Sequence, residues 1–294
     1  MERRLGKLIF VSYLDRSGST YFISRLGALK NVFAFPECEW IIDNVLVKEY
    51  RNFNELKEAF LISIHKDEKL KNWKFTQKEI NSIFSQSKNK GEVFINLLNV
   101  YKNKYDKEAF VGVLKRQYIL FYKNKILWEL KDMIEIHWFS IIRNPIDVYV
   151  SMKTTLDPYK GKPFEGNIIS FFRRWHFSSG LIERNSDKVF FYEKFMTDTS
   201  EELKNISEIL GINYSYDSKK ITDFYNRFSE KDKMLHLRIL KDSGSIEKNT
   251  KRKLSLLERL LIKLFLYRKK KYIHVNSLAK FIYFCVARFC KLKK

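Results

Sequence analysis

The stretch SYLDRSGSTYFISRLGAL, residues 12–29, decides the fold class that this sequence predicts. An apolar run at 7–13 leads into it and is suited to a buried strand, and apolar residues at helical spacing follow its turn. A second short apolar run, at 32–35, has the character of another strand. A strand, a helix and a strand at this spacing predict a βαβ unit and therefore a parallel sheet.

The turn at 16–20 has the composition of an anion-binding site. A strand that feeds a turn and a helix start points several backbone N–H groups at one place, and the helix dipole adds positive potential there. Gly18 lets the backbone approach closely, and Arg16 supplies a charged planar donor. The Walker A pattern is absent because no lysine precedes Ser19, which disfavours Mg²⁺-dependent NTP hydrolysis. An ordinary strand-to-helix connection uses the same small residues, so the turn alone does not establish a site.

A second segment, RNPIDVYVSM at 143–152, follows the predicted strand at 138–142. Arg143 thus lies at the carboxyl end of a strand, where open α/β sheets bind ligands. Asn144 and Pro145 predict a helix start, and Ser151 lies about 12 Å further along that helix. An anion beside the helix would bind Arg143 and Ser151; the alternative is an Arg143–Asp147 pair with Ser151 in solvent.

Further elements follow from the same patterns. Residues 189–192 are predicted to form a strand, Thr199 and Glu202 a capping box, and Gly211 a helix end. Residues 53–128 have a mostly helical character. We expect one α/β domain over 1–252, with a helical insertion at about 53–128, and a basic amphipathic helical extension over 253–294.

The charge of the chain predicts an anionic partner. Lysine and arginine exceed the acids by 22, and residues 251–294 hold 14 basic residues and one acid, Glu258. Such a segment suits an anionic membrane surface, although a helix packed on the domain with a solvated basic face explains it equally well. Three cysteines without a CxxC pair, no signal peptide and no bilayer-length apolar stretch predict a cytoplasmic protein, peripheral at the inner face of the membrane.

The two segments together resemble the paired signature motifs of the sulfotransferases that use 3′-phosphoadenosine 5′-phosphosulfate (PAPS). In that family the first turn holds the 5′-phosphosulfate, and the Arg-Asn-Pro segment with its later Ser holds the 3′-phosphate. FFYEKFMTD at 190–198, HLRILKDSGSIEKNTKRKLS at 236–255 and FPECEW at 35–40 match further family segments, the last of them found in carbohydrate-acting members. The likeness spans residue 7 to about 255.

The resemblance implies a P-loop-like three-layer α/β fold with a central parallel sheet flanked by helices. It also implies sulfuryl transfer from PAPS to an acceptor hydroxyl, with adenosine 3′,5′-bisphosphate (PAP) leaving and no metal required. The expected catalytic residues are Arg16 and Glu37. The expected cofactor-binding residues are Arg16, Ser17, Gly18, Ser19, Thr20, Arg143, Ser151, Tyr192, Ser243, Gly244, Ser245 and Lys248.

Glu37 is the preferred general base, since burial in a closed cleft raises the pKa of a carboxyl group toward neutrality. Glu39 and the histidines stay open as alternatives, His236 above the others. Asp15 and Asn249 depart from the family pattern. Lys115 matches a lysine that some members place near the acceptor.

Pro36 and Glu37 favour a carbohydrate or glycolipid acceptor, while a lipid, a small metabolite and a tyrosyl peptide stay open. Two other function classes compete. One is a P-loop-type kinase or nucleotide-binding protein without sulfuryl transfer, which the missing lysine disfavours. The other is a basic protein that binds nucleic acid or membranes. Nucleic acid is not expected as a partner, because most aromatic residues fall on apolar stripes and no nucleic-acid-binding motif occurs.

Overall fold

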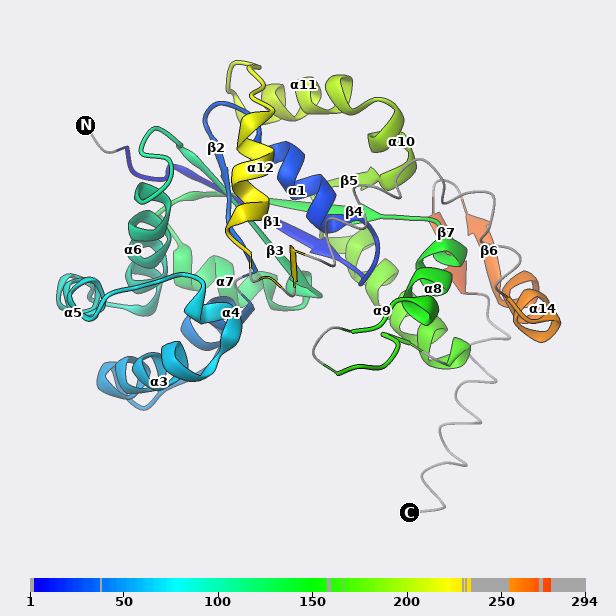
Figure 1. Cartoon of the computed structure of the whole chain (residues 1–294), viewed down its shortest axis with the longest axis horizontal. Helices are drawn as coiled ribbons and strands as arrows, with labels where there is room; N and C mark the ends of the chain where they lie inside the picture. Colours follow the sequence, from blue (N-terminus) through cyan, green and yellow to red (C-terminus); the bar gives the residue numbers. More distant parts are fainter. Residues whose placement is uncertain are drawn as a thin grey trace, which may run out of the picture.

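A five-stranded parallel sheet in the order β2-β3-β1-β4-β5 forms the centre of the protein (Figure 1). The computed structural model describes residues 3–37, 39–157, 160–165, 167–228, 230, 232–233, 254–269 and 272–275. The strands of the sheet are β1 (Lys7–Tyr13), β2 (Val32–Ala34), β3 (Val111–Gln117), β4 (Glu135–Ile142) and β5 (Lys188–Phe191).

Helices cover both faces of the sheet. They are α1 (Ser19–Gly27), α2 (Glu39–Ile41), α3 (Phe53–Lys66), α4 (Glu68–Lys71), α5 (Gln77–Gln86), α6 (Lys90–Asn103), α7 (Lys123–Leu130), α8 (Pro145–Thr154), α9 (Ile168–Asn185), α10 (Tyr192–Thr197), α11 (Thr199–Leu210), α12 (Lys219–Asn226) and α14 (Leu256–Phe265). A π-helix, η1 (Ile42–Val47), and a 3-10 helix, η2 (Ile119–Tyr122), join some of them.

The central strand β1 shows why the sheet has helices on both sides. Successive strand residues point to opposite faces. Leu8 and Phe10 pack into the core formed with α3, α5 and α6, whereas Ile9 and Val11 pack into the core formed with α1, α11 and α12. Because both faces are buried, apolar residues occupy the consecutive positions Leu8 to Val11 rather than every second one. The predicted three-layer α/β fold is confirmed.

Strand order places the candidate site. From β1 the chain crosses to β2 on one side, and β4 later pairs with β1 on the other side. The carboxyl ends of β1 and β4 therefore flank a topological switch point, where open α/β sheets leave a crevice for ligands. The turn at 16–20 follows β1 and Arg143 follows β4, so both segments meet at this crevice.

One strand was missed in the sequence. β3 lies within the region expected to be mostly helical, and it separates β1 from β2, which are parallel as predicted but not neighbours. Its apolar run is short, and Lys115 and Arg116 follow directly, so periodicity alone does not distinguish it from a helix.

Of two predicted helix starts, the structure confirms one and contradicts the capping pattern of the other. The start of α8 is confirmed, since the Asn144 side chain accepts a hydrogen bond from the amide of Ile146 and Pro145 is the first helical residue. The Thr199–Glu202 capping box is wrong. Thr199 donates to the carbonyl of Phe195, and Glu202 pairs with Lys194, because α10 directly precedes α11 and supplies closer partners. Gly211 ends α11 with a φ of 61°, as predicted.

The basic extension is helical only in part of its described length. α14 forms, but β6 (Leu266–Lys269) and β7 (Tyr272–Val275) then pair as an antiparallel hairpin instead of continuing a helix. Its one acid, Glu258, accepts hydrogen bonds from Tyr149 at 2.6 Å and from Lys153 at 2.8 Å, both on α8. The domain division at 252 stays a prediction, and residues 276–294 lie outside the described part of the chain.

Candidate functional site

The turn after β1 is shaped to receive an anion. Arg16 has a φ of 66° and Gly18 a φ of 85°, and such left-handed positions turn successive amides toward a common point. Among the residues that the structure describes, no side chain caps α1, and the first turn of this helix holds no acid. Ser17 Oγ is buried and finds no hydrogen-bond partner among the described residues. Buried polar groups in native proteins are nearly always paired, so this hydroxyl fits a ligand that binds the turn.

Gly18 is required by its contact with Tyr192, the first residue of α10. A Cβ at position 18 would lie 2.2 Å from Cδ2 of that ring. Tyr192, predicted to bind the cofactor, thus lies directly against the turn. On its ring lies the guanidinium of Arg143, with 4.6 Å between the guanidinium carbon and the ring centroid.

Arg143 completes the positively charged end of the site. Its Nε is buried and unpaired within the described part of the chain. Next to it, the amide of Asn144 donates to a carboxylate oxygen of Glu193 at 2.8 Å, which fixes the strand end against α10. The Tyr192-Glu193 pair therefore holds the Arg143 segment from two sides. The role of Glu193 was not predicted, because nothing local in the sequence pairs it with residue 144.

Arg16 and Ser151 connect the two signature segments. Arg16 Nε donates to Ser151 Oγ at 3.1 Å. Burial and the like charge of Arg143 lower the pKa of Arg16 to about 10. Two cationic groups that repel each other in a buried crevice are an arrangement that an anion would stabilise. The resemblance placed Arg16 at the 5′ end and Ser151 at the 3′ end of the nucleotide; the structure brings them into direct contact.

Asp15, which departs from the family pattern, does not direct all of its negative charge at the turn. Its carboxylate lies 3.8 Å from Arg174 on α9. Burial raises its pKa, and Arg174 is the strongest of the groups that counter this effect. The acid is thus shared with a cation from another helix.

Thr20 begins a chain of contacts that leads away from the turn. Its hydroxyl accepts a hydrogen bond from Lys115 Nζ at 2.7 Å, and the same nitrogen lies 3.1 Å from Glu37 Oε1. Lys69 on α4 pairs with the other oxygen of Glu37. Lys115 is 3% exposed, so its charge depends on these partners. Lys69 was not predicted, since only packing of the helical insertion brings α4 to this strand end.

The expected raised pKa of Glu37 is wrong. Burial alone would raise it, but Lys115 and Lys69 together outweigh burial and lower the pKa of Glu37 below its ordinary value. Glu39 behaves in the opposite way: burial and the charge of Glu37 raise its pKa. Glu39 also accepts a hydrogen bond from the Tyr13 hydroxyl at 3.4 Å, at the end of β1. Glu39 is the first residue of α2, whereas Glu37 lies before this helix.

Several other predicted groups lie elsewhere. His137 is 2.8 Å from Glu135 at the amino end of β4, on the edge of the sheet opposite the turn. His236, Ser243, Gly244, Ser245, Lys248 and Asn249 lie outside the described residues. No group of three His, Cys, Asp or Glu residues suited to a metal occurs among the residues that the structure describes.

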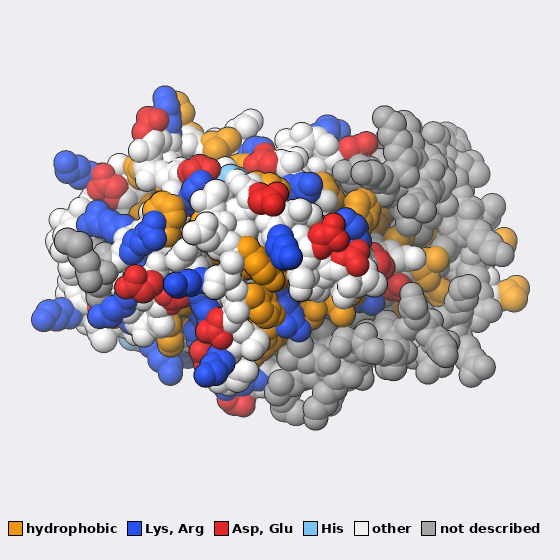
Figure 2. Space-filling model, turned by 90° about the horizontal axis from the view of Figure 1, so that it is seen from above, with side chains coloured by type: hydrophobic (Ala, Val, Ile, Leu, Met, Phe, Trp, Pro, Cys, Tyr) orange, Lys and Arg blue, Asp and Glu red, His pale blue; other side chains and the backbone are white. Residues whose placement is uncertain are grey.

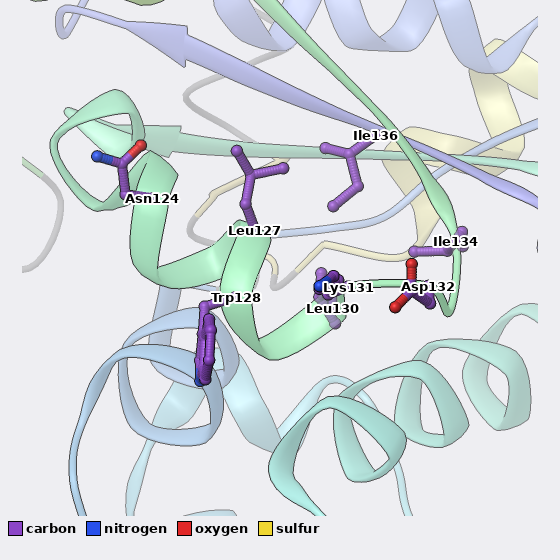
Figure 3. A pocket seen from close by; sticks show the side chains of 8 residues that line it. All are labelled: Asn124, Leu127, Trp128, Leu130, Lys131, Asp132, Ile134 and Ile136. Carbon is purple, nitrogen blue, oxygen red and sulfur yellow. The ribbon is translucent and has the colours of Figure 1, made fainter.

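A cavity of about 460 Å³ lies apart from this site (Figure 3). Leu127 and Trp128 of α7 line it together with Ile134, which directly precedes β4, and Ile136, the second residue of that strand. It thus lies toward the amino ends of the strands, opposite the turn at 16–20.

Searches with this chain returned no matching family model and no matching curated protein. Among solved structures, the sulfotransferase domain from the Synechococcus PCC 7002 olefin synthase is similar at a TM-score of 0.51 and 14% identity, covering 97% of this chain and 96% of that chain. The sulfotransferase domain from the curacin biosynthetic pathway gives a TM-score of 0.46 at 14% identity over 97% and 98% of the two chains. Mouse sulfotransferase SULT7A1 complexed with PAP gives 0.36 at 13% identity over 78% and 66%. The likeness to the olefin synthase domain shows that the chain has the fold of a sulfotransferase domain, with two of its polar segments joined at the switch point of the sheet.

Proposed function

We propose that this protein transfers a sulfuryl group from PAPS to the hydroxyl of an acceptor. The contact that supports this most directly is Arg16 to Ser151, which joins the two segments that resemble the family signatures. Ser17 Oγ, next to Arg16 in the turn, and Arg143 Nε, after β4, are two further buried donors that have no partner among the described residues. An adenosine with phosphate groups at both its 3′ and 5′ positions would present two anionic groups to these donors, whereas a single phosphate presents one.

The residues divide between the two ends of the nucleotide. The amides from Ser17 to Thr20 would bind the 5′-phosphosulfate, and Arg143 with Ser151 the 3′-phosphate. Arg16 stabilises the negative charge that develops on the departing phosphate oxygen. In the reaction the acceptor oxygen forms a bond to sulfur, the bond from sulfur to the 5′-phosphate oxygen breaks, and PAP leaves.

The acceptor proton needs a base, and Glu39 is the better of the two carboxylates for this role. A catalytic base works best when its pKa lies near the working pH. The pKa of Glu39 is raised toward that range, whereas two lysines hold that of Glu37 down. Glu37 instead fixes Lys115, and Lys115 fixes Thr20 of the turn.

A carbohydrate or glycolipid is the proposed acceptor. The Pro36-Glu37 pattern, which resembles that of carbohydrate-acting members, supports it. No metal takes part in this proposal, because fixed cationic side chains meet the leaving group.

Binding and turnover test the proposal separately. Isothermal titration calorimetry should show PAP binding in moderate salt, without added Mg²⁺. Incubation with ³⁵S-labelled PAPS and a panel of glycans should transfer label to a glycan. Absence of PAP binding would overturn the proposal for every acceptor. Displacement of PAP by ATP with Mg²⁺ would favour the kinase class instead.

Nucleic acid is not proposed as a partner. On the face that Figure 2 shows, basic side chains are interspersed with acidic ones rather than gathered into one continuous patch. Binding to oligonucleotides should therefore be weak at physiological salt.

We further infer that the extension from residue 253 brings the protein to an anionic membrane at the cytoplasmic face. Leu256 and Leu257 are 84% and 64% exposed on α14, and the one acid of the segment is turned onto α8. Within the described residues, no helix has the length and apolar character needed to cross a bilayer.

Flotation with phosphatidylglycerol vesicles tests this inference. The full-length chain should float, and Leu256→Asp with Leu257→Asp should float less. Ile62→Asp, on the exposed side of α3, serves as the matched control. Equal flotation of all three proteins would contradict membrane binding through α14.

A further inference from the structure

A cavity of about 360 Å³ adjoins the proposed base on the side away from Lys69. Glu39 lines this cavity and also a second one of about 200 Å³ that Lys69 lines, so the acid lies between the two. Gln117 at the end of β3 lines the larger cavity, and its register partner in the sheet is Tyr13. The cavity thus opens at the strand ends that carry the turn at 16–20.

One wall of this cavity is aromatic and exposed. Phe121 of η2 is 61% exposed and Phe177 of α9 is 46% exposed. Their ring centroids lie 6.2 Å apart, and Tyr118 contacts Phe177 edge-on at 5.5 Å. Segments nearly 60 residues apart therefore contribute to one aromatic surface. Exposed aromatic rings gathered in a concave site are typical of ligand-binding surfaces.

Two other residues that line the cavity carry buried polar atoms. Gln117 Nε2 and the Tyr118 hydroxyl are buried and have no hydrogen-bond partner within the described part of the chain. Tyr118 adopts a φ of 56°, a backbone conformation that is costly for this residue and recurs at ligand-binding sites. Arg116 and Asp43, which also line the cavity, pair with each other. A ligand with several hydroxyl groups would satisfy these polar atoms.

We propose that this aromatic cleft binds the acceptor as a sugar ring; the inference rests on the proposed sulfuryl transfer. The C–H face of a pyranose would lie on Phe177 and Phe121. Its hydroxyls would meet Gln117 and Tyr118, and the reacting hydroxyl would face Glu39. A purely apolar alcohol would leave the buried polar atoms unpaired, which costs binding free energy.

Acceptor kinetics test the cleft separately from the nucleotide site. With ³⁵S-labelled PAPS, Phe177→Ala should raise the KM of the best oligosaccharide acceptor about tenfold and leave the KM of PAPS unchanged. Phe177→Leu keeps the apolar volume, and it should raise the acceptor KM as well, since the flat ring is lost. Calorimetry with PAP should give the wild-type dissociation constant for both variants, which shows that the fold and the nucleotide site are intact.

Trp128→Ala is the matched control, because that residue is 77% exposed in the cavity of Figure 3, away from the site. It should change neither KM. An unchanged acceptor KM in Phe177→Ala would overturn the proposal that the cleft binds the acceptor. If PAP still binds, this result would leave the proposed function standing. Transfer to 2-naphthol or 1-octanol but to no glycan would likewise overturn the sugar assignment. Failure of the wild-type protein to bind PAP would instead overturn the proposed function itself.

Discussion

The Nε of Arg16 lies 3.1 Å from the Oγ of Ser151, although 135 residues separate them in the sequence. The bond joins the turn after β1 to the second turn of α8 across the switch point of the sheet. Through this bond, Arg16 belongs both to the donors of the turn and to the donors of the Arg143–Ser151 segment. Its side chain would therefore lie near the phosphate groups at both ends of a bound nucleotide.

Removal of either partner should weaken nucleotide binding to different degrees. Arg16→Ala should raise the PAP dissociation constant about 10- to 100-fold, since a charged hydrogen bond contributes about 1.5–3 kcal/mol. Ser151→Ala should raise it about 3- to 10-fold, because a neutral hydroxyl contributes less. Arg184→Ala removes the same charge from an exposed position near the amino end of β5, and calorimetry should show no change. An equal loss of PAP affinity in the Arg16 and Arg184 variants would mean that PAP binding depends only on the net charge of the protein.

Substitution of Gly18 should damage the site more than substitution of Gly211. Both have positive φ, at 85° and 61°, but only Gly18 lies against a ring, at 2.2 Å from Tyr192. Gly211→Ala should cost about 1 kcal/mol of unfolding free energy from backbone strain alone. Gly18→Ala should cost about 1–3 kcal/mol more, since the ring must move, and should also weaken PAP binding. Urea denaturation and calorimetry measure the two effects, and similar values for both variants would contradict the contact.

The acid side of the pH profile should report Glu39. Because burial and Glu37 raise its pKa, the active carboxylate is lost as pH falls through that raised value. The quantity kcat/KM should therefore decline tenfold per pH unit below it. Glu39→Gln should lower kcat by about 10²- to 10⁴-fold and remove this decline. An unchanged acid limb in Glu39→Gln would assign the base to another group.

Glu37 should matter for stability instead. Its pKa is lowered in the folded protein, so its stabilising effect is present above the unfolded value of about 4.3 and is lost as pH falls below it. Glu37→Gln should lower the unfolding free energy at pH 7 by about 1–3 kcal/mol, because Lys115 and Lys69 lose a charged partner. The difference in unfolding free energy between Glu37→Gln and the wild-type protein should become smaller when denaturation is repeated near pH 3.5. If this difference in unfolding free energy were the same at both pH values, the charge of Glu37 would not contribute to stability.

The hydrogen bonds from Tyr149 and Lys153 to Glu258 tether α14 to α8, and this tether should control the access of proteases to the basic extension. Burial opposes ionisation of Glu258, but hydrogen bonds from Lys153, Tyr149 and Ser255 lower its pKa to about 2, so it stays charged at physiological pH. Glu258→Ala should speed tryptic cleavage within residues 251–263 several-fold, because local opening becomes easier. Glu201→Ala, an exposed acid of α11, is the control. Equal cleavage rates would mean that the tether does not hold the helix.

The sequence by itself determined the local structure of the two segments that resemble the family signatures. The apolar run before residue 14, the small residues at 16–20 and the Asn144-Pro145 start of α8 each act over a few residues, so their effect is readable without the fold. The resemblance of these segments to paired signatures predicted the fold that the comparison with the olefin synthase domain confirms. The order of the strands was not determined in this way, because strand β3 pairs with residues about 80 to 100 positions away.

Only the tertiary structure decided which groups meet and how they ionise. Glu37 was expected to carry a raised pKa, yet Lys69 and Lys115 reach it from a helix and a strand that lie far along the chain. Glu39, Tyr118 and Phe177 come from three separate elements to line one cavity. A hydrogen bond needs its two heavy atoms within about 3 Å, and Coulomb interactions weaken with distance and are screened over about 10 Å, so the chemistry of a carboxylate depends on neighbours that folding alone brings near.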